Sequence, residues 1–422
     1  MRRIILMKTI ELNEKIECRG SYDVIVAGGG VAGCAAALSA VRSGKSALII
    51  EKSQIFGGLA TLGLINFFVP MCNGRGKQII YGMAEEFLSL SIKYGYDTIP
   101  EIWKNGDPAN YPENGPRYIT HYSADIFALA LTEQLHTEGV DIMFDSVVSM
   151  PVMNGCHCDG LIIENKSGRE YYEGKIIIDT TGDADVLYRA GVPTVQRGNF
   201  YTYIAKLITI DSCRKAAESG NIRDAMTGIA GGGSSLYGKG HPQGMPLFTG
   251  TTSKDVNNYL ITNQLHMLSK LKQTDRFSRN VVTLPGMCQY RTTRRIDGDY
   301  VLREADVYRH FDDSVGAIND FDRRDYLYEI PYGTLICSKY DNLLTAGRSA
   351  AGEGYAWDVL RVIPPAIISG QAAGLAAAQA IDEACGVGAI DIRKLQASLE
   401  AGNVDIHFDD ADIPEKDRRS AD

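Results

Sequence analysis

The feature that most constrains the fold is a strand–turn–helix–strand segment near the start of the chain. Residues 22–27 (YDVIVA) predict a strand buried on both faces of a parallel sheet. Residues 31–43 (VAGCAAALSAVRS) predict a helix of small residues, and Gly44 is a typical residue to end it. Residues 46–50 (SALII) predict a second strand. Together they form a complete βαβ unit of about 30 residues, which predicts an α/β fold with a Rossmann-like parallel sheet.

The turn inside this unit has the glycine spacing of a dinucleotide-binding site. Gly28 permits the tight turn, Gly30 lets the backbone approach a pyrophosphate, and Gly33 lets the helix pack close to the strand. The amides at the helix N-terminus then face the phosphates. Glu51 ends the second strand, where a carboxylate binds a ribose diol and repels the additional phosphate of NADP. These residues therefore disfavour NADP and leave NAD and FAD open.

The segment after Glu51 favours FAD. Gly57 and Gly58 would let a second loop lie against the pyrophosphate. Residues 56–120 are rich in glycine and aromatic residues, whereas the simplest NAD domains continue directly into a third strand. We therefore expect a ligand that lies extended across the sheet, as FAD does.

Two later strand ends strengthen this preference. One buried strand ends in Thr181-Gly182-Asp183, and another ends in Gly347 with Arg348 after it. Such ends bring backbone amides to a cofactor at the carboxyl edge of a parallel sheet.

The last long helix, predicted over residues 364–385, supports the same interpretation. It begins with two prolines, which the first helical turn tolerates well. The positive N-terminal end would stabilise the negative charge of a reduced flavin ring. Small residues such as Gly370 serve either close helix packing or contact with the cofactor, and both roles are compatible.

Taken in order, these segments resemble the FAD-dependent oxidoreductases that have a glutathione-reductase-type FAD domain and no separate NAD domain. The matching stretches are YDVIVAGGGVAGCAAALSAVRSG, EKSQIFGGLATLGLINFF, IIIDTTGDADVLYRAG, YRTTRRIDGDYVL, YEIPYGTLICSKYDNLLTAGRS and RVIPPAIISGQAAGLAAAQAI. The resemblance implies a non-covalently bound FAD with a backbone contact to adenine near Val147. Together with the glycine turns it predicts a cofactor site formed by Gly28, Gly30, Val31, Ala32, Gly33, Glu51, Lys52, Gly57, Gly58, Ala60, Thr61, Val147, Thr181, Gly182, Asp183, Gly347, Arg348 and Gly370.

The composition divides the chain into regions. Glycine clusters, a polar helix and an arginine-dense stretch distinguish residues 196–334, which we expect to form an inserted α+β substrate or cap domain. The FAD-binding domain is then discontinuous, over residues 20–195 and 335–390. Residues 391–422 predict one short helix and a charged tail that frays.

Four side chains are the predicted catalytic or substrate-binding residues. A flavin enzyme needs a substrate atom near N5 of the ring and often an acid or base opposite. Tyr355 and Asp358 lie in SAAGEGYAWDVL, where the chain departs from the Ser/Thr/His-rich turn of many relatives. Arg291 would bind a carboxylate or phosphate, or pair structurally with nearby acids. His241, in the loop GKGHPQG, would reach a pocket.

These observations predict an FAD-dependent dehydrogenase that moves a hydride between flavin N5 and a small polar or carboxylated metabolite. One alternative is a flavin monooxygenase that uses external NAD(P)H. Its typical GD-x-A-H-like stretch is replaced here by AGRSAAG. The other alternative is a flavin-dependent RNA-modifying protein, which the formal net charge of −9 disfavours.

Composition sets the remaining expectations. The acidic balance predicts no nucleic-acid partner, and no apolar run reaches the roughly 18 residues needed to span a membrane. The odd number of cysteines, 9, predicts reduced thiols in a cytoplasm. Cys156-x-Cys158 has no second pair at ligand spacing, so no metal is predicted. We expect a small-molecule substrate, while the electron acceptor and the oligomeric state, a homo-oligomer included, remain open.

Overall fold

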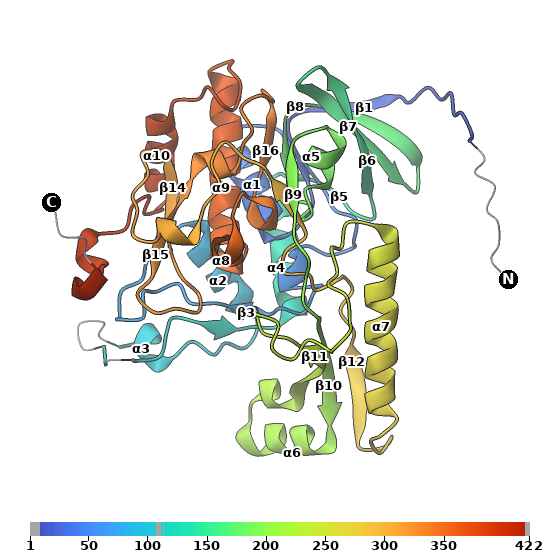
Figure 1. Ribbon diagram of the computed structural model, residues 1–422, viewed down its shortest axis with the longest axis vertical. Coiled ribbons are helices and arrows are strands. Elements are labelled where there is room, and N and C mark those ends of the chain that lie inside the picture. Colours follow the sequence, from blue (N-terminus) through green and yellow to red (C-terminus); the bar gives the residue numbers. More distant parts are fainter. Residues whose placement is uncertain (1–8, 107–110, 113, 418–422) are drawn as a thin grey trace.

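The main structural element is a seven-stranded sheet in the order β5-β2-β1-β8-β7-β6, with β16 also paired to β8 (Figure 1). The computed structural model describes residues 9–106, 111–112 and 114–417. The strands of the sheet are β1 (Cys18–Ala27), β2 (Ala47–Ile50), β5 (Asp141–Met143), β6 (Val147–Asn154), β7 (His157–Asn165), β8 (Gly168–Asp179) and β16 (Leu343–Thr345).

The strand directions confirm the predicted Rossmann-like architecture. β1 runs parallel to β2 and β8, while β5 and β16 extend the parallel part on either side. β6 and β7 are antiparallel and form a meander that leads into β8. The apolar run Val24–Ala27 is fully buried, because helices and strands cover both faces of β1.

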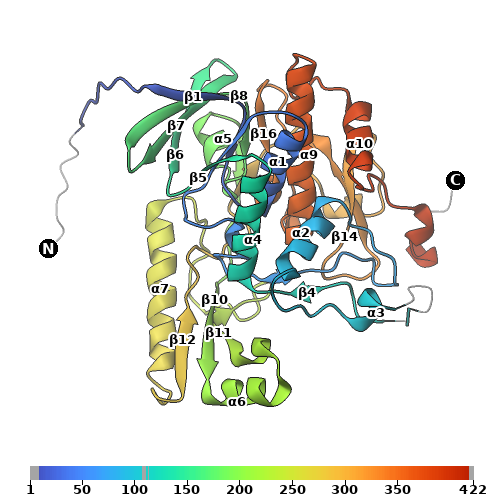
Figure 2. The same cartoon turned by 180° about the vertical axis from the view of Figure 1, so that it is seen from behind.

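Two glycine- and alanine-rich helices form the core of the main layer. α1 (Val31–Arg42) packs along α9 (Ile363–Asp382), and α4 (Ala124–Thr137) and α2 (Met83–Ile92) lie beside them (Figure 2). A Cβ on Gly374 would lie 2.3 Å from the carbonyl oxygen of Ala36, so small residues permit this close approach. The other helices are α3 (Glu101–Lys104), α5 (Asp185–Arg189), α6 (Ile210–Ser219), α7 (Ser253–Leu271), α8 (Gly354–Leu360) and α10 (Ile392–Ala401).

A second sheet, in the order β11-β10-β12, lies beyond the main layer together with α6 and α7 (Figure 1). Its strands are antiparallel: β10 (Thr202–Thr209), β11 (Met226–Gly233) and β12 (Arg279–Thr283). The hairpin of β14 (Ser314–Asn319) and β15 (Leu327–Pro331) instead contributes Val315 and Ile318 to the main core. The domain boundaries predicted at residues 195 and 335 remain a proposal.

Short strand pairs connect these parts. β9 (Thr194–Gln196) pairs with β13 (Arg294–Ile296). This pairing brings together the residues that come just before and just after the second sheet in the sequence. β3 (Phe67–Phe68) pairs with β4 (Thr120–His121) within the glycine- and aromatic-rich excursion. Each pairing joins two segments that are far apart in sequence. Phe68 of β3 packs in the core on one face of the main sheet, and Ile296 of β13 packs in the core on the other face.

Residues 404–413, in the segment after α10, are packed, which corrects for them the prediction that the tail frays. Residues 418–422 lie outside the described residues. Val404, Ile406 and Phe408 are each no more than 7% exposed, and Ile413 is buried as well. The N–H of Ala317 in β14 donates to the carbonyl oxygen of Asp405 at 2.6 Å. The alternation of apolar residues places one face of the segment on the β14–β15 hairpin, while Asp405, Asp409 and Asp410 are exposed.

In the part of the chain that the structure describes, no single helix is long and apolar enough to cross a membrane. Only α8 and α9 together meet that test of length and composition, across a bend of 75°. Most of α9 is buried against α1 and the sheet, as expected of a core helix.

Candidate active site

The predicted dinucleotide turn joins β1 to α1 at the carboxyl edge of the parallel sheet. A Cβ on Gly33 would lie 2.0 Å from the carbonyl oxygen of Gly28, so only glycine lets α1 approach the turn this closely. Gly30 is the N-cap of α1, and a Cβ there would meet no atom of the described chain within 4 Å apart from its neighbours. The space before the first amides of α1, from Val31 and Ala32 onward, is therefore open and fits a pyrophosphate.

The second glycine loop lies directly against this turn. The N–H of Gly57 donates to the carbonyl oxygen of Gly29 at 2.8 Å, and a Cβ on Gly58 would lie 3.2 Å from Cα of Gly30. Gly57 and Gly58 have φ of 101° and 56°, a region that favours glycine. Ala60 and Thr61 follow, and the Thr61 hydroxyl donates to the carbonyl oxygen of Phe56 at 2.5 Å. The two loops thus form one cradle.

Glu51 is held at the end of β2 by backbone amides. Its Oε2 accepts from the N–H of Gly29 and its Oε1 from the N–H of Ser53, each at 2.7 Å. A carboxylate offers about four acceptor positions, so capacity for a ribose diol remains. Lys52 beside it is exposed, and Val147 at the start of β6 is 50% exposed. These positions agree with the predicted adenosine end of the site.

A buried carboxylate organises the turn after β8. Asp179 accepts at Oδ1 from the N–H and the hydroxyl of Thr181, at 2.9 and 2.7 Å. Its Oδ2 accepts from the N–H of Leu187 at 2.9 Å. Burial raises the pKa of Asp179 from 3.8 to about 6. This carboxylate fixes the backbone of Thr181, Gly182 and Asp183 at the sheet edge.

Asp179 should make the stability of the protein depend on pH. Because its pKa is higher in the folded chain, the folded state binds the proton more tightly, and this contribution to stability decreases as the pH rises through about 6. Relative to Asp179→Asn, the wild type should gain roughly 1 kcal/mol of unfolding free energy between pH 7.5 and pH 5. Urea unfolding of both proteins at both pH values measures this gain. If the free energies of unfolding of wild type and Asp179→Asn differ by the same amount at pH 7.5 and pH 5, the prediction is wrong.

Arg348 connects the two strand ends. Its Nε donates to the carbonyl oxygen of Gly182 at 2.8 Å, and its Nη2 lies 2.6 Å from Oδ1 of Asp183. Its Nη1 donates to the carbonyl oxygen of Tyr290 at 2.6 Å. A Cβ on Gly347 would lie 2.9 Å from Cβ of Ala32, so this strand end reaches α1. The Arg348 side chain is thus engaged by protein atoms, and the N–H of Gly347 donates to the Ser369 hydroxyl at 2.9 Å. The predicted cofactor contacts of both residues remain a proposal.

Gly370 has a packing role that the geometry explains. A Cβ there would lie 2.2 Å from the carbonyl oxygen of Ala32, so α9 could not approach α1 with a larger residue. Its predicted contact with the cofactor remains a proposal. The N-terminus of α9 has prolines in its first turn and no acidic residue there, so its positive end is not neutralised by the helix itself.

Asp358 lies in a buried ion cluster. Its Oδ1 accepts from Nε of Arg361 at 2.8 Å, and its Oδ2 lies 3.1 Å from Nη1 of Arg197. Its side chain is 4% exposed. Two guanidinium groups therefore hold this carboxylate, which gives it a positioning role and argues against the predicted role as an acid or base.

Tyr355 is also fixed by a buried partner. Its hydroxyl donates to Oδ1 of Asp320 at 2.7 Å, and the ring stacks on Phe321. Burial raises the pKa of the Tyr355 hydroxyl, and the hydrogen bond to Asp320 raises it further. The proton thus stays on the tyrosine. The predicted substrate contact of Tyr355 remains a proposal.

His241 has no free ring nitrogen. The N–H of Tyr201 donates to its Nδ1 at 3.0 Å, so Nε2 carries the proton and donates to the carbonyl oxygen of Met245 at 2.9 Å. The ring also packs edge-on against Phe200. His241 holds its own loop in place, and this argues against the predicted catalytic role.

Arg291 differs from the other arginines of its run. Arg295 pairs with Asp297 at 3.6 Å, within the run, as its structural interpretation predicts. Arg294 pairs instead with Asp185 at 2.7 Å, an acid outside the run. Arg291 donates to the carbonyl oxygens of Ser234 and Ser235, at 2.8 and 3.4 Å. Among the described residues no carboxylate pairs with it. Burial lowers the pKa of Arg291, and the charge of Arg361 lowers it further.

The sequence interpretation missed Arg197 and Arg361. Arg361 immediately precedes the first turn of α9, and burial lowers its pKa while the charges of Arg348 and Arg197 act in the same direction. Four guanidinium groups therefore lie near two carboxylates, Asp183 and Asp358. They belong to Arg197, Arg291, Arg348 and Arg361. The excess of positive charge makes this region suited to an anion.

Comparisons with known proteins identify the family of the chain. Residues 23–200 and 262–399 match the model of the family described as FAD dependent oxidoreductase. Thioredoxin reductase of Ureaplasma parvum is 33% identical over 81 residues, which are 19% of this chain and 26% of that protein. NADH:fumarate oxidoreductase of Klebsiella pneumoniae is 25% identical over 194 residues, 38% of this chain and 20% of that protein. The chain thus spans about a quarter or less of these relatives.

Two solved structures align with most of the chain at low sequence identity. A geranylgeranyl bacteriochlorophyll reductase-like protein from Thermoplasma acidophilum has a TM-score of 0.46 at 14% identity, over 90% of this chain and 83% of that one. The p-nitrophenol 4-monooxygenase from Pseudomonas putida has a TM-score of 0.48 at 12% identity, over 93% and 91%. The family match covers more than half of the chain, so the protein belongs to the FAD dependent oxidoreductase family and its cofactor is FAD.

Proposed function

We propose that this enzyme transfers a hydride between N5 of bound FAD and a small carboxylated metabolite. This proposal rests on the surroundings of Arg291. Its guanidinium is half-buried and has no carboxylate partner among the described residues. A substrate carboxylate would supply that partner through paired, charge-assisted hydrogen bonds. The neighbouring charge of Arg361 adds to the attraction.

Each part of the site has a distinct task in this proposal. The cradle of Gly30 and Gly58 would hold the pyrophosphate, Glu51 the ribose, and the N-terminus of α9 would lie near the flavin ring. FAD supplies the hydride chemistry when it is bound. Arg291 binds and orients the substrate carboxylate. Asp358 fixes Arg361 and Arg197, so that their positive charge stays in place beside the substrate.

Steady-state turnover with an artificial electron acceptor tests the proposal. A panel of small hydroxy, amino and saturated carboxylic acids is compared with the corresponding primary amides. Turnover with at least one acid and a strong loss with its amide is the expected result, because the amide lacks the charge that Arg291 binds. Equal activity with acid and amide would contradict the proposed substrate class.

Replacing Arg291 by methionine should weaken substrate binding and leave the flavin in place. The loss of a charge-assisted pair predicts an increase in KM of about 10–100-fold for the carboxylate substrate, with a smaller effect for Arg291→Lys. Arg276→Met is the matched control, because Arg276 is an exposed arginine that lies over the ring of its neighbour Phe277 and has no part in the proposed site. A KM for Arg291→Met equal to that of the control would exclude Arg291 from the substrate site.

A further inference from the structure

A cluster of two histidines and a glutamate lies outside the site described above. His310 precedes β14, Glu329 is in β15, and His407 is in the segment that follows α10. Nδ1 of His310 lies 2.6 Å and Nδ1 of His407 lies 2.9 Å from the same atom, Oε1 of Glu329. One nitrogen or oxygen from each of the three residues falls within 4.8 Å of the others. Three separate segments thus present donor atoms to one point.

The electrostatics of this cluster suit a cation. Glu329 is 0% exposed, and its Oε2 accepts from the N–H of Phe311 at 2.8 Å. Oε1 is therefore left to the two imidazoles. Nε2 of His310 lies 3.0 Å from Oδ1 of Asp410, and a carboxylate in that position typically orients a metal-binding histidine. Two carboxylates with two neutral imidazoles carry two negative charges, which one divalent ion balances.

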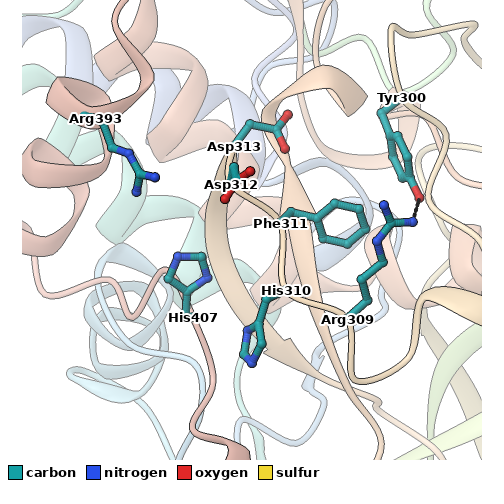
Figure 3. Close-up of a pocket in the computed structure, with 8 residues that line it drawn as sticks. All are labelled: Tyr300, Arg309, His310, Phe311, Asp312, Asp313, Arg393 and His407. Carbon is teal, nitrogen blue, oxygen red and sulfur yellow. Dashed lines mark hydrogen bonds between the residues drawn. The ribbon is translucent and has the colours of Figure 1, made fainter. Parts of the chain in front are cut away.

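The cluster borders a cavity that gives it access to solvent. The cavity has a volume of about 720 Å³ and is lined by both histidines, Arg309 and Arg393 among others. Figure 3 shows the two imidazoles beside one another at one side of this cavity. The histidine side chains are 40% and 37% exposed, so the cluster has a side that is open to solvent. The open side leaves room for a water ligand to complete four-coordination.

We propose that Nδ1 of His310, Nδ1 of His407 and Oε1 of Glu329 bind one divalent transition-metal ion, with zinc as the test ion. Bonds of about 2.0–2.2 Å in a tetrahedral arrangement separate donor atoms by roughly 3.3 Å, so each histidine Nδ1 needs to move away from Oε1 of Glu329 by less than about 1 Å. Imidazole and carboxylate ligands are typical of zinc. The bound ion fastens the segment after α10 to β15.

Zinc content of the FAD-loaded protein tests this proposal. The protein is exposed to zinc chloride, dialysed and analysed for zinc and flavin. The wild type should retain about one zinc per chain, and Glu329→Gln and His407→Ala should retain less than about a tenth of that. His136→Ala is the matched control, because His136 is an exposed histidine on α4. Unchanged flavin content shows that each variant is folded.

Two further measurements keep the test independent of folding defects. Asp410→Asn leaves all three ligands in place and should weaken zinc binding by about 10-fold. X-ray absorption at the zinc edge should show nitrogen and oxygen ligands and no sulfur, because the chain also contains 9 cysteines. Zinc retained equally by wild type and His407→Ala, sulfur ligation, or flavin-loaded wild type without zinc would overturn the proposal.

Discussion

Valine at position 30 should empty the flavin site and leave the fold intact. Gly30 has φ of −67° and ψ of 174°, an extended conformation that any residue adopts. A Cβ there meets no non-neighbouring atom of the described chain within 4 Å, so the first side-chain atom fits without a clash. The added side chain would instead occupy the space before the amides of α1, where the pyrophosphate is expected. FAD per chain should fall from about one to less than about a tenth.

The matched control is Gly228→Val in β11, a glycine outside the proposed cofactor site whose added Cβ would lie 4.0 Å from Cγ2 of Ile204, an ordinary van der Waals contact. It should retain FAD. The FAD-free forms of wild type and Gly30→Val should unfold within about 1 kcal/mol of each other, the usual cost of an altered N-cap. Flavin is measured after release by heat, and stability by urea unfolding. Full FAD content in Gly30→Val would place the pyrophosphate elsewhere.

Removing the Asp358 carboxylate should strongly destabilise the protein. Asp358→Ala leaves Arg361 and Arg197 close together without their counter-charge. Breaking a buried ion pair by removing one partner typically costs about 3–5 kcal/mol, and we expect a loss of that size in urea unfolding. Asp358→Asn keeps an oxygen acceptor and should lose less.

This result separates a positioning role from a catalytic one. A catalytic acid or base would lower kcat by about 100-fold or more with little change in stability. Asp297→Ala is a control, because Asp297 pairs with Arg295 only at 3.6 Å and is 53% exposed. It should change the unfolding free energy by less than about 1 kcal/mol. If Asp358→Ala loses no more stability than Asp297→Ala but shows a large fall in kcat, Asp358 is a catalytic residue and not a positioning residue.

The parallel sheet could be predicted from sequence because its signals are local. The buried strand before Gly28, the small-residue helix after it and the strand before Glu51 all lie within one short segment, and the structure confirms each of them. The two-proline start of the last long helix was visible for the same reason. These signals, with the family match, confirm the prediction of an FAD-binding oxidoreductase.

The packed segment after α10 was predicted wrongly because charge dominated the interpretation. Val404, Ile406 and Phe408 alternate with polar residues, the pattern of a strand with one buried face. The surrounding aspartates suggested a solvated tail instead. The hairpin that buries this face is formed by residues 314–331, and nothing local in the tail identifies such a partner.

The charge partners in the site could not be predicted for a similar reason. Whether an arginine is neutralised depends on acids that the fold brings close, as Asp185 is brought to Arg294 and none of the described acids to Arg291. The histidines of the proposed metal site are separated by almost a hundred positions, from His310 to His407. Ligand-spacing rules, which use short intervals, do not detect such a set.

The most direct test of the account is an anaerobic flavin titration of the wild-type enzyme with the panel of carboxylic acids. We predict that one acid bleaches the oxidised flavin without NAD(P)H, or that its oxo or unsaturated counterpart reoxidises flavin that dithionite has reduced. Either outcome, at about one equivalent per FAD, shows direct hydride exchange with a carboxylated metabolite. A flavin that responds to no member of the panel, but is reduced by NAD(P)H and then hydroxylates a substrate with oxygen, would contradict the account and support the monooxygenase alternative.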